Sequence, residues 1–278
     1  MRVLVTGGAG YVGSHACKAL AAAGHQPIVF DNLTQGRAAF VKWGPLELGD
    51  LLDTQRLDAA FALHKPEAVI HFAALSVVGD SMSDPAVYYR ANIAGTIELL
   101  DAMRRAGVGT IVFSSTAAVY GTPKAVPVTE DSDLAPINTY GFTKFAIERA
   151  FADYQRAYGL KWAALRYFNA AGADPDGEIG EAHDPETHVM PLAIRAALGR
   201  GGVFKLFGED YPTPDGTCIR DYIHVCDLAD AHVAALDHLT RGGGSGAFNL
   251  GTGKGVSVRE ILAAVGEAVG APVPLQSA

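Results

Sequence analysis

Short apolar segments alternate with amphipathic stretches along the first 169 residues of the chain. The apolar segments are β-branched or aromatic, and a helical pattern separates each from the next; they are Arg2–Thr6, Pro27–Asp31, Ala68–Phe72, Thr110–Ser114 and Lys161–Tyr167. Continuous apolar strands separated by helices are typical of a parallel sheet that is covered on both faces. We therefore expect an α/β fold built on a doubly wound parallel Rossmann sheet.

The pattern changes after residue 169. Residues 170–188 and 208–217 carry Gly, Asp and Pro without periodicity, and 241–246 is a glycine-rich stretch that predicts a flexible connector. We expect one domain over 1–169 and a smaller C-terminal α/β domain over 170–278. Within the second range, residues 222–250 are expected to pack back onto the first domain.

Composition and charge limit the partners. The 278 residues are 49% hydrophobic and 19% charged, with a formal net charge of −8. An acidic surface repels phosphate backbones, so no nucleic-acid partner is expected. No apolar run reaches the roughly 20 residues of a membrane span, and the chain opens directly on a strand without an apolar leader. These features predict a cytoplasmic protein that does not bind membranes.

The cysteines and histidines do not form a recognisable metal or disulfide motif. Cys17, Cys218 and Cys226 are odd in number and lack a C-x-x-C pair, which favours a reducing compartment. His183 and His188 share one loop, but neither a thiol nor an H-E-x-x-H companion accompanies them. The sequence therefore predicts no metal site.

A glycine-rich turn follows the first strand. Gly7, Gly10 and Gly13 give G-x-x-G-x-x-G, and the helix that begins there would direct its N–H groups at a pyrophosphate. Asp31 ends the second strand 18 residues later, where a carboxylate can bind ribose hydroxyls and repel a 2′-phosphate. The turn therefore predicts binding of NAD rather than NADP. Arg37 could favour NADP, but we interpret it as a solvated loop residue.

One helix predicts the chemistry. Tyr140 and Lys144 are four residues apart and so share a helix face. A free phenol has a pKa near ~10, and the positive charges of Lys144 and of a bound nicotinamide would favour its ionisation. Thr116 follows a strand that ends in Ser114 and Ser115, at the sheet edge where ligands bind. We expect Tyr140 to act as a base, with Thr116 sharing its proton.

Together these residues resemble the extended short-chain dehydrogenase/reductase family, and within it the enzymes that epimerise nucleotide sugars. The resemblance covers essentially the whole chain. Its clearest stretches are Gly7–Gly13, Asp31–Asn32, Gly49–Leu51, His71–Ala74, Tyr88–Gly95, Ser114–Gly121, Tyr140–Lys144, Arg166–Asn169 and, most specific of all, Phe207–Val225. The resemblance implies that the chain interconverts UDP-glucose and UDP-galactose through a 4-keto sugar and regenerates NAD in each cycle.

The resemblance also assigns residues to each ligand. The first domain is expected to hold NAD through Gly7, Gly10, Tyr11, Val12, Gly13, Asp31, Asn32, Leu33, Thr34, Gly36, Asp50, Leu51, Phe72, Ala73, Ala74, Ser76, Asn92, Ser114, Tyr140, Lys144 and Phe168. The second is expected to bind the UDP-sugar, with contacts from Thr116, Asn169, His188, Val189, Lys205, Leu206, Phe207 and Arg220. Helices near 84–105 and 139–158 are expected to form a homodimer.

Three departures from the family pattern change these expectations. Ser76 stands where some members carry a lysine near the cofactor phosphates, and His188 replaces an amide. The chain ends at Ala278, whereas family members continue with a segment that supplies another arginine and a residue that limits sugar size. We therefore expect reduced substrate affinity.

Four alternative functions compete with this interpretation. Sugar 4,6-dehydration needs an acid/base pair where this chain has Ala117 and Ala118, and alanine transfers no proton. Epimerisation of UDP-xylose or UDP-N-acetylglucosamine stays open. A net NAD-dependent oxidoreductase is opposed by Arg220 and its loop. An inactive NAD-binding protein is opposed by the intact Thr116, Tyr140 and Lys144.

Overall fold

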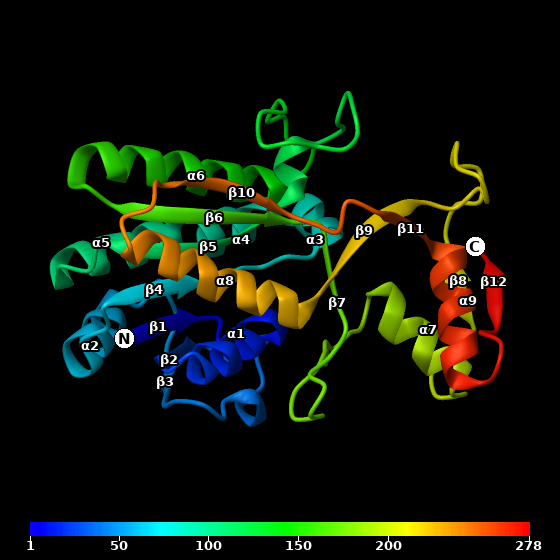
Figure 1. Cartoon of the computed structure of the whole chain (residues 1–278), viewed down its shortest axis with the longest axis horizontal. Coiled ribbons are helices and arrows are strands. Elements are labelled where there is room, and N and C mark those ends of the chain that lie inside the picture. The colour runs from blue at the N-terminus through cyan, green and yellow to red at the C-terminus, as the bar shows by residue number, and fades with distance from the viewer.

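A seven-stranded parallel sheet forms the centre of the computed structural model, which describes residues 1–278 (Figure 1). Its strands are β1 (Arg2–Thr6), β2 (Gln26–Asp31), β3 (Leu46–Leu48), β4 (Ala68–His71), β5 (Thr110–Thr116), β6 (Lys161–Tyr167) and β10 (Gly246–Leu250). The order is β10-β6-β5-β4-β1-β2-β3, and every neighbouring pair is parallel. The predicted doubly wound fold is confirmed.

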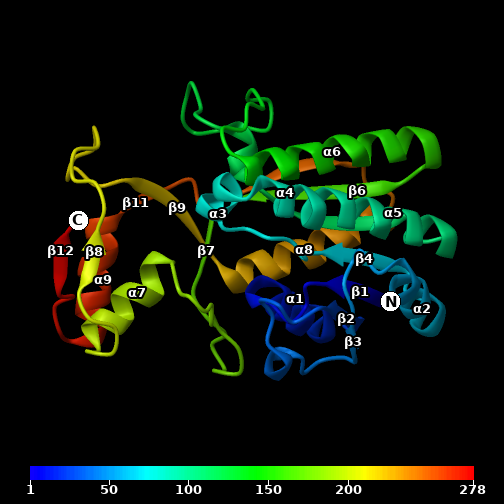
Figure 2. The same cartoon turned by 180° about the vertical axis from the view of Figure 1, so that it is seen from behind.

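Helices cover both faces of this sheet because alternate strand residues point to opposite sides. On one face, α1 (Tyr11–Ala22) and α8 (Val225–Thr240) pack on Val3 and Val5. On the other face, α2 (Thr54–His64), α5 (Gly95–Ala106) and α6 (Thr139–Tyr158) bury Leu4 and Phe113 (Figure 2). The strands therefore read as continuous apolar runs, since neither face meets water.

A second, smaller lobe lies beyond the carboxyl ends of the strands (Figure 1). It contains a three-stranded sheet, β11-β9-β7 (Gly255–Ser257, Ile219–His224 and Asn169–Ala171), and the parallel pair β8 and β12 (Phe204–Leu206 and Leu275–Ser277). Helices α7 (Val189–Ala197) and α9 (Val258–Val269) pack together over Phe204 and Leu206. This lobe thus has a hydrophobic core of its own.

The structure adds elements that the hydrophobic pattern did not predict. β3 and β10 extend the sheet at its two edges, and β5 continues to Thr116, two residues beyond the predicted strand. The glycine-rich stretch 241–246 is a tight link that carries the chain from α8 into β10. Short elements complete the chain: η1 (Ala38–Phe40), α3 (Val78–Ser83), α4 (Pro85–Tyr88), η2 (Tyr89–Ala94) and η3 (Ala117–Tyr120).

The chain crosses between the lobes more than once. Residues 225–250 return to the Rossmann sheet, where α8 packs on α1 and β10 pairs with β6. Residues after β10 then rejoin the second lobe through β11, α9 and β12. None of the helices combines the length and apolar character that a bilayer crossing requires.

Candidate active site at the carboxyl edge of the sheet

The glycine turn after β1 has no room for side chains. Gly7 has a φ of +72°, and a Cβ at this position would lie 2.6 Å from the backbone nitrogen of Ala73. A Cβ at Gly13 would collide with the carbonyl oxygen of Gly7. Gly10 precedes α1, and no side chain caps the first turn of that helix. Its N–H groups are therefore available to an anion such as a pyrophosphate.

Asp31 is fixed beside this turn. Its carboxylate accepts hydrogen bonds from the backbone nitrogens of Ala9 (3.0 Å) and Leu33 (2.8 Å), while burial raises its pKa. A Cβ at Gly36 would lie 2.8 Å from Asp31 Oδ1. Arg37 is exposed, as predicted, and its guanidinium also donates to the carbonyl of Ala182, at 2.5 and 2.8 Å. Arg37 therefore anchors the 170–188 segment.

Asn92 shapes the segment that follows β4. It lies in η2, a π-helical turn, and is 1% exposed. Its amide accepts from the backbone nitrogen of Leu75 (2.8 Å) and donates to the carbonyl of Leu75 (3.0 Å) and to Thr143 (3.1 Å). Asn92 thus joins the residues after β4 to α6, and its predicted direct contact with NAD stays a prediction.

Tyr140 and Lys144 lie where the start of α6 meets the end of β5. Asn138 caps the helix by accepting a hydrogen bond from the backbone nitrogen of Gly141 (2.7 Å). Lys144 Nζ donates to the carbonyl of Ser114 (2.8 Å) and lies 5.8 Å from the centroid of the Tyr140 ring. The tertiary structure therefore brings the predicted tyrosine–lysine pair to the end of the strand that carries Thr116.

The electrostatics of this pair depend on burial. Burial raises the pKa of the Tyr140 phenol above its usual value, and the Thr116 hydroxyl acts in the opposite direction. Burial lowers the pKa of Lys144 to about 7, which Glu148 opposes. The prediction that Lys144 and a bound nicotinamide together favour the phenolate concerns the protein with its cofactor and stays a prediction. In the protein alone, desolvation disfavours the charged form of both groups.

A buried ion pair lies one turn beyond Lys144 on the same helix. Glu148 Oε2 accepts from Arg166 Nη2 at 2.6 Å, and both side chains are about 95% buried, at 5% and 6% exposure. Ser115 donates to the other oxygen of Glu148 (2.5 Å), and Arg166 Nη1 donates to the Tyr120 hydroxyl (2.8 Å). Sequence reasoning missed this network. Its signal was a glutamate and an arginine at positions where α6 and β6 are otherwise apolar.

Thr116, in β5, is the predicted substrate residue of the first lobe, and the others lie in or directly beside four elements of the second lobe. Asn169, in β7, donates to the carbonyl of Asp221 (2.8 Å), and Arg220 lies in β9. Leu206, in β8, packs into the core of this lobe, so its side chain is not available to a ligand. Phe207 is exposed. These residues do not share one element. Their contacts with the substrate stay predictions.

His188 and Val189 lie at the start of α7, and His188 has unexpected neighbours. Glu181 and Glu186 both contact its Nδ1 atom, at 2.8 and 2.9 Å, and raise the pKa of its imidazole to about 9. His183 lies beside Glu181 in the same cluster. The two carboxylates belong to no thiol or H-E-x-x-H motif, so the sequence pattern that predicted no metal site gave no sign of them.

The chain is similar to a known protein family and to curated enzymes. The family model described as "NAD dependent epimerase/dehydratase family" matches residues 3–251. A curated UDP-glucose 4-epimerase of Rhizobium meliloti is 59% identical over 263 residues, which cover 95% of this chain and 80% of that protein.

Two solved structures are similar over nearly the whole chain. A UDP-glucose 4-epimerase from Brucella ovis, in complex with NAD, has a TM-score of 0.97 and 54% identity, with 99% of this chain and 85% of that chain covered. A second, from Stenotrophomonas maltophila, holds NAD and formylated UDP-arabinopyranose. Its TM-score is 0.95 at 42% identity, covering 100% of this chain and 86% of that chain.

Proposed function

The chain belongs to the NAD dependent epimerase/dehydratase family, and we propose that it inverts carbon 4 of a UDP-sugar, interconverting UDP-glucose and UDP-galactose. The observation that carries this proposal is the meeting of Tyr140 and Lys144 with the end of β5, at the sheet edge that also holds the glycine turn. Similarity to UDP-glucose 4-epimerases over nearly the whole chain supports the choice of sugar nucleotide.

NAD fits the first lobe. The turn has no space for side chains at Gly7 and Gly13, so a pyrophosphate could approach its backbone closely. No side chain caps the start of α1, so the first N–H groups of that helix are free to bind the pyrophosphate. Asp31 faces the same turn with a carboxylate for ribose hydroxyls, and Arg37 is bound to Ala182 instead of facing a 2′-phosphate. When bound, NAD supplies a reversible hydride acceptor, which lets carbon 4 pass through a ketone.

The residues of this chain move the proton. The raised pKa keeps the Tyr140 phenol protonated in the protein alone, so it takes the 4-hydroxyl proton only after a positive charge beside it lowers that pKa. The Thr116 hydroxyl shares the proton with the phenol during that transfer. Lys144, held by the carbonyl of Ser114, would bind a ribose hydroxyl of NAD through its remaining N–H groups.

Inversion also requires the sugar to turn while its diphosphate stays bound. We assign nucleotide-sugar binding to the lobe over 170–278, with Arg220 and the start of α7 at the diphosphate, and NAD binding to the lobe over 1–169. Ala117 and Ala118 lie in η3, directly after Thr116, and offer no acid or base for elimination of water. Epimerisation without dehydration is therefore favoured.

We also propose a homodimer formed through an apolar face of η2 and α6. Tyr89 and Phe142 contact each other edge to face, with ring centroids 6.0 Å apart, and both are exposed. Phe145 extends the cluster, and Val87 is exposed nearby in sequence. A contiguous aromatic patch of this kind is typical of a protein interface. A cytoplasmic location is supported by the free thiols of all three cysteines.

The proposal is tested with purified protein, UDP-glucose and no added NAD, by resolving the epimeric products chromatographically. Tyr140→Phe should lower turnover by roughly 10²–10⁴-fold, because it removes the proton-transferring hydroxyl. Retained NAD should be unchanged. Tyr158→Phe is the matched control, since Tyr158 is an exposed tyrosine at the far end of the same helix.

Two results would count against the proposal. One is near-normal turnover of Tyr140→Phe. The other is NADH accumulating in solution in proportion to substrate consumed, which indicates a net oxidoreductase. Parallel reactions with UDP-N-acetylglucosamine and UDP-xylose identify the preferred sugar.

A further inference from the structure

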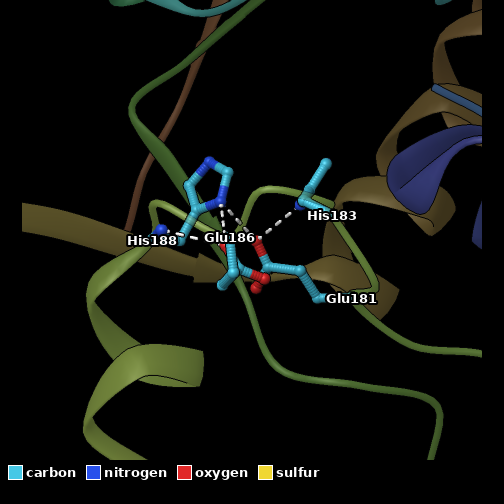
Figure 3. A group of neighbouring side chains, drawn as sticks. All are labelled: Glu181, His183, Glu186 and His188. Atoms are coloured by element: carbon cyan, nitrogen blue, oxygen red, sulfur yellow. Dashed lines mark hydrogen bonds and ion pairs between the residues drawn. The ribbon is translucent and has the colours of Figure 1, made fainter. Parts of the chain in front are cut away.

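Two glutamates and two histidines converge in the segment before α7. Figure 3 shows the side chains of Glu181, His183, Glu186 and His188 turned toward one another. One ligand atom from each lies within 4.8 Å of the others. The closest pairs join Glu181 Oε1 to His188 Nδ1 (2.8 Å), Glu186 Oε1 to His188 Nδ1 (2.9 Å) and Glu181 Oε1 to His183 Nδ1 (3.2 Å).

Two atoms of this cluster are buried without a hydrogen-bond partner. The Glu186 side chain is 1% exposed, and its Oε2 atom accepts no hydrogen bond. The Nδ1 atom of His183 is also buried and makes no hydrogen bond, although it lies 3.2 Å from Glu181 Oε1. Buried polar atoms are almost always paired, since leaving one unsatisfied costs about 1–3 kcal/mol. Both atoms belong to residues of the same cluster.

No lysine or arginine side chain pairs with the two carboxylates. Every ion pair of Glu181 and Glu186 is made with a histidine, and the nearby guanidinium of Arg37 binds the carbonyl of Ala182. The chain's other acidic cluster is different. There Lys18 Nζ contacts Asp174, Asp176 and Glu178 at 2.6–3.0 Å, so a lysine ammonium occupies the position that a cation would take.

We propose that Glu181, His183, Glu186 and His188 bind one divalent transition-metal ion of the zinc type. Two imidazoles with two carboxylates form a donor set suited to zinc, whereas calcium and magnesium prefer oxygen alone. Tetrahedral zinc, with ligands at about 2.0–2.1 Å, separates its donor atoms by about 3.3 Å. The three closest separations, of 2.8–3.2 Å, therefore need to widen by about half an ångström or less to admit the ion, and the remaining ones, all within 4.8 Å, need to shorten by up to about 1.5 Å.

The ion has a positioning role, because all four of its ligands come from side chains and none of its positions is left for substrate. It connects the loop that Arg37 anchors to His188, the residue that precedes the first turn of α7. The proton and hydride steps of the proposed epimerisation involve none of the four ligands, although His188 also lies at the start of α7, which we assign to the diphosphate.

Metal content is measured on protein without a polyhistidine tag, stripped on a chelating resin, reloaded with Zn²⁺ and passed through gel filtration. Elemental analysis should find about one zinc per chain. Co²⁺ in its place should give the visible absorption bands of a four-coordinate ion. Glu186→Gln keeps the side-chain shape and removes one ligand charge, and His183→Asn removes an imidazole. Each should weaken zinc binding by about tenfold or more in competition with a chromophoric chelator.

Asp184→Asn is the matched control, since Asp184 lies between the ligands, is exposed and is outside the cluster. It should bind zinc like the unmodified protein. Circular dichroism of the metal-free variants shows whether each one folds, and either variant alone suffices for the test. Less than about a tenth of an equivalent bound by the unmodified protein would overturn the proposal. So would equal affinities of Glu186→Gln, His183→Asn and Asp184→Asn. Epimerase activity is assayed separately, so its presence or absence does not decide this question.

Discussion

The buried pair of Glu148 and Arg166 offers the most direct test of how the core supports the active site. Glu148→Gln keeps the size of the side chain but leaves the Arg166 guanidinium, 6% exposed, without its counterion. Arg166 donates to the Glu148 carboxylate at 2.6, 3.1 and 3.2 Å, and Tyr120 offers it only a neutral hydroxyl. Removing one partner of such a pair costs about 3–5 kcal/mol of the free energy of unfolding.

The measurement is urea unfolding of the metal-free and cofactor-free protein, followed by circular dichroism, with thermal unfolding as a second readout. A loss of about 3 kcal/mol should lower Tm by roughly 6–12 °C for a chain of this size. Arg105→Gln is the matched control, because Arg105 pairs with Asp58 at the surface, where both side chains are nearly half exposed. Exposed pairs contribute about 0–1 kcal/mol.

The double variant Glu148→Gln with Arg166→Met separates two contributions to the loss of stability: the lost ion pair itself, and the guanidinium left buried without a counterion. Removing the stranded guanidinium should recover stability, so the double variant should be less destabilised than the sum of the single ones. If Glu148→Gln lies within about 1 kcal/mol of the unmodified protein, the burial argument is refuted, because that value is typical of a solvated pair.

Three further predictions follow from the site and its surface. Burial lowers the pKa of Lys144 to about 7 in the folded protein, against 10.5 as its ordinary value. The unfolded chain then binds more protons between these values, so the free energy of unfolding of the cofactor-free protein should rise with pH across this window, and Lys144→Met should flatten the rise in urea titrations. Gly13→Ala directs a Cβ at the carbonyl of Gly7 and should weaken NAD binding by about tenfold or more, measured by fluorescence titration; unchanged affinity would contradict the close packing of the turn. Phe142→Asp should convert the proposed dimer to monomers in sedimentation analysis, whereas Leu63→Asp, at an exposed position on α2, should leave it intact; a monomeric unmodified protein would refute the interface.

Much of the fold follows from local patterns in the sequence. The apolar segments that end at Thr6, Asp31 and Tyr167 became β1, β2 and β6, because a strand covered on both faces must be apolar throughout. The glycine turn and the four-residue spacing of Tyr140 and Lys144 were also predicted, since each depends only on backbone geometry over a few residues. These features indicated the family, the cofactor and the tyrosine–lysine pair that we propose for proton transfer.

The edge strands were not predictable in the same way. β10 is partly exposed along its length and lacks an apolar run, and it becomes a strand because β6 offers an unpaired edge. Asn92 gave no sequence signal for its bonds to Leu75 and Thr143, which depend on how η2 meets α6. Tertiary packing decides such elements, because their partners are distant in the chain.

The sequence by itself determined which residues can carry the chemistry; the tertiary structure decided their charges and their partners. Burial raises the pKa of Tyr140 and lowers that of Lys144, an effect that their spacing does not reveal. Arg37 binds a carbonyl 145 residues away, and Glu181 and Glu186 turn toward His188. Desolvation and long-range contacts arise only when the chain is folded, so no local pattern encodes them.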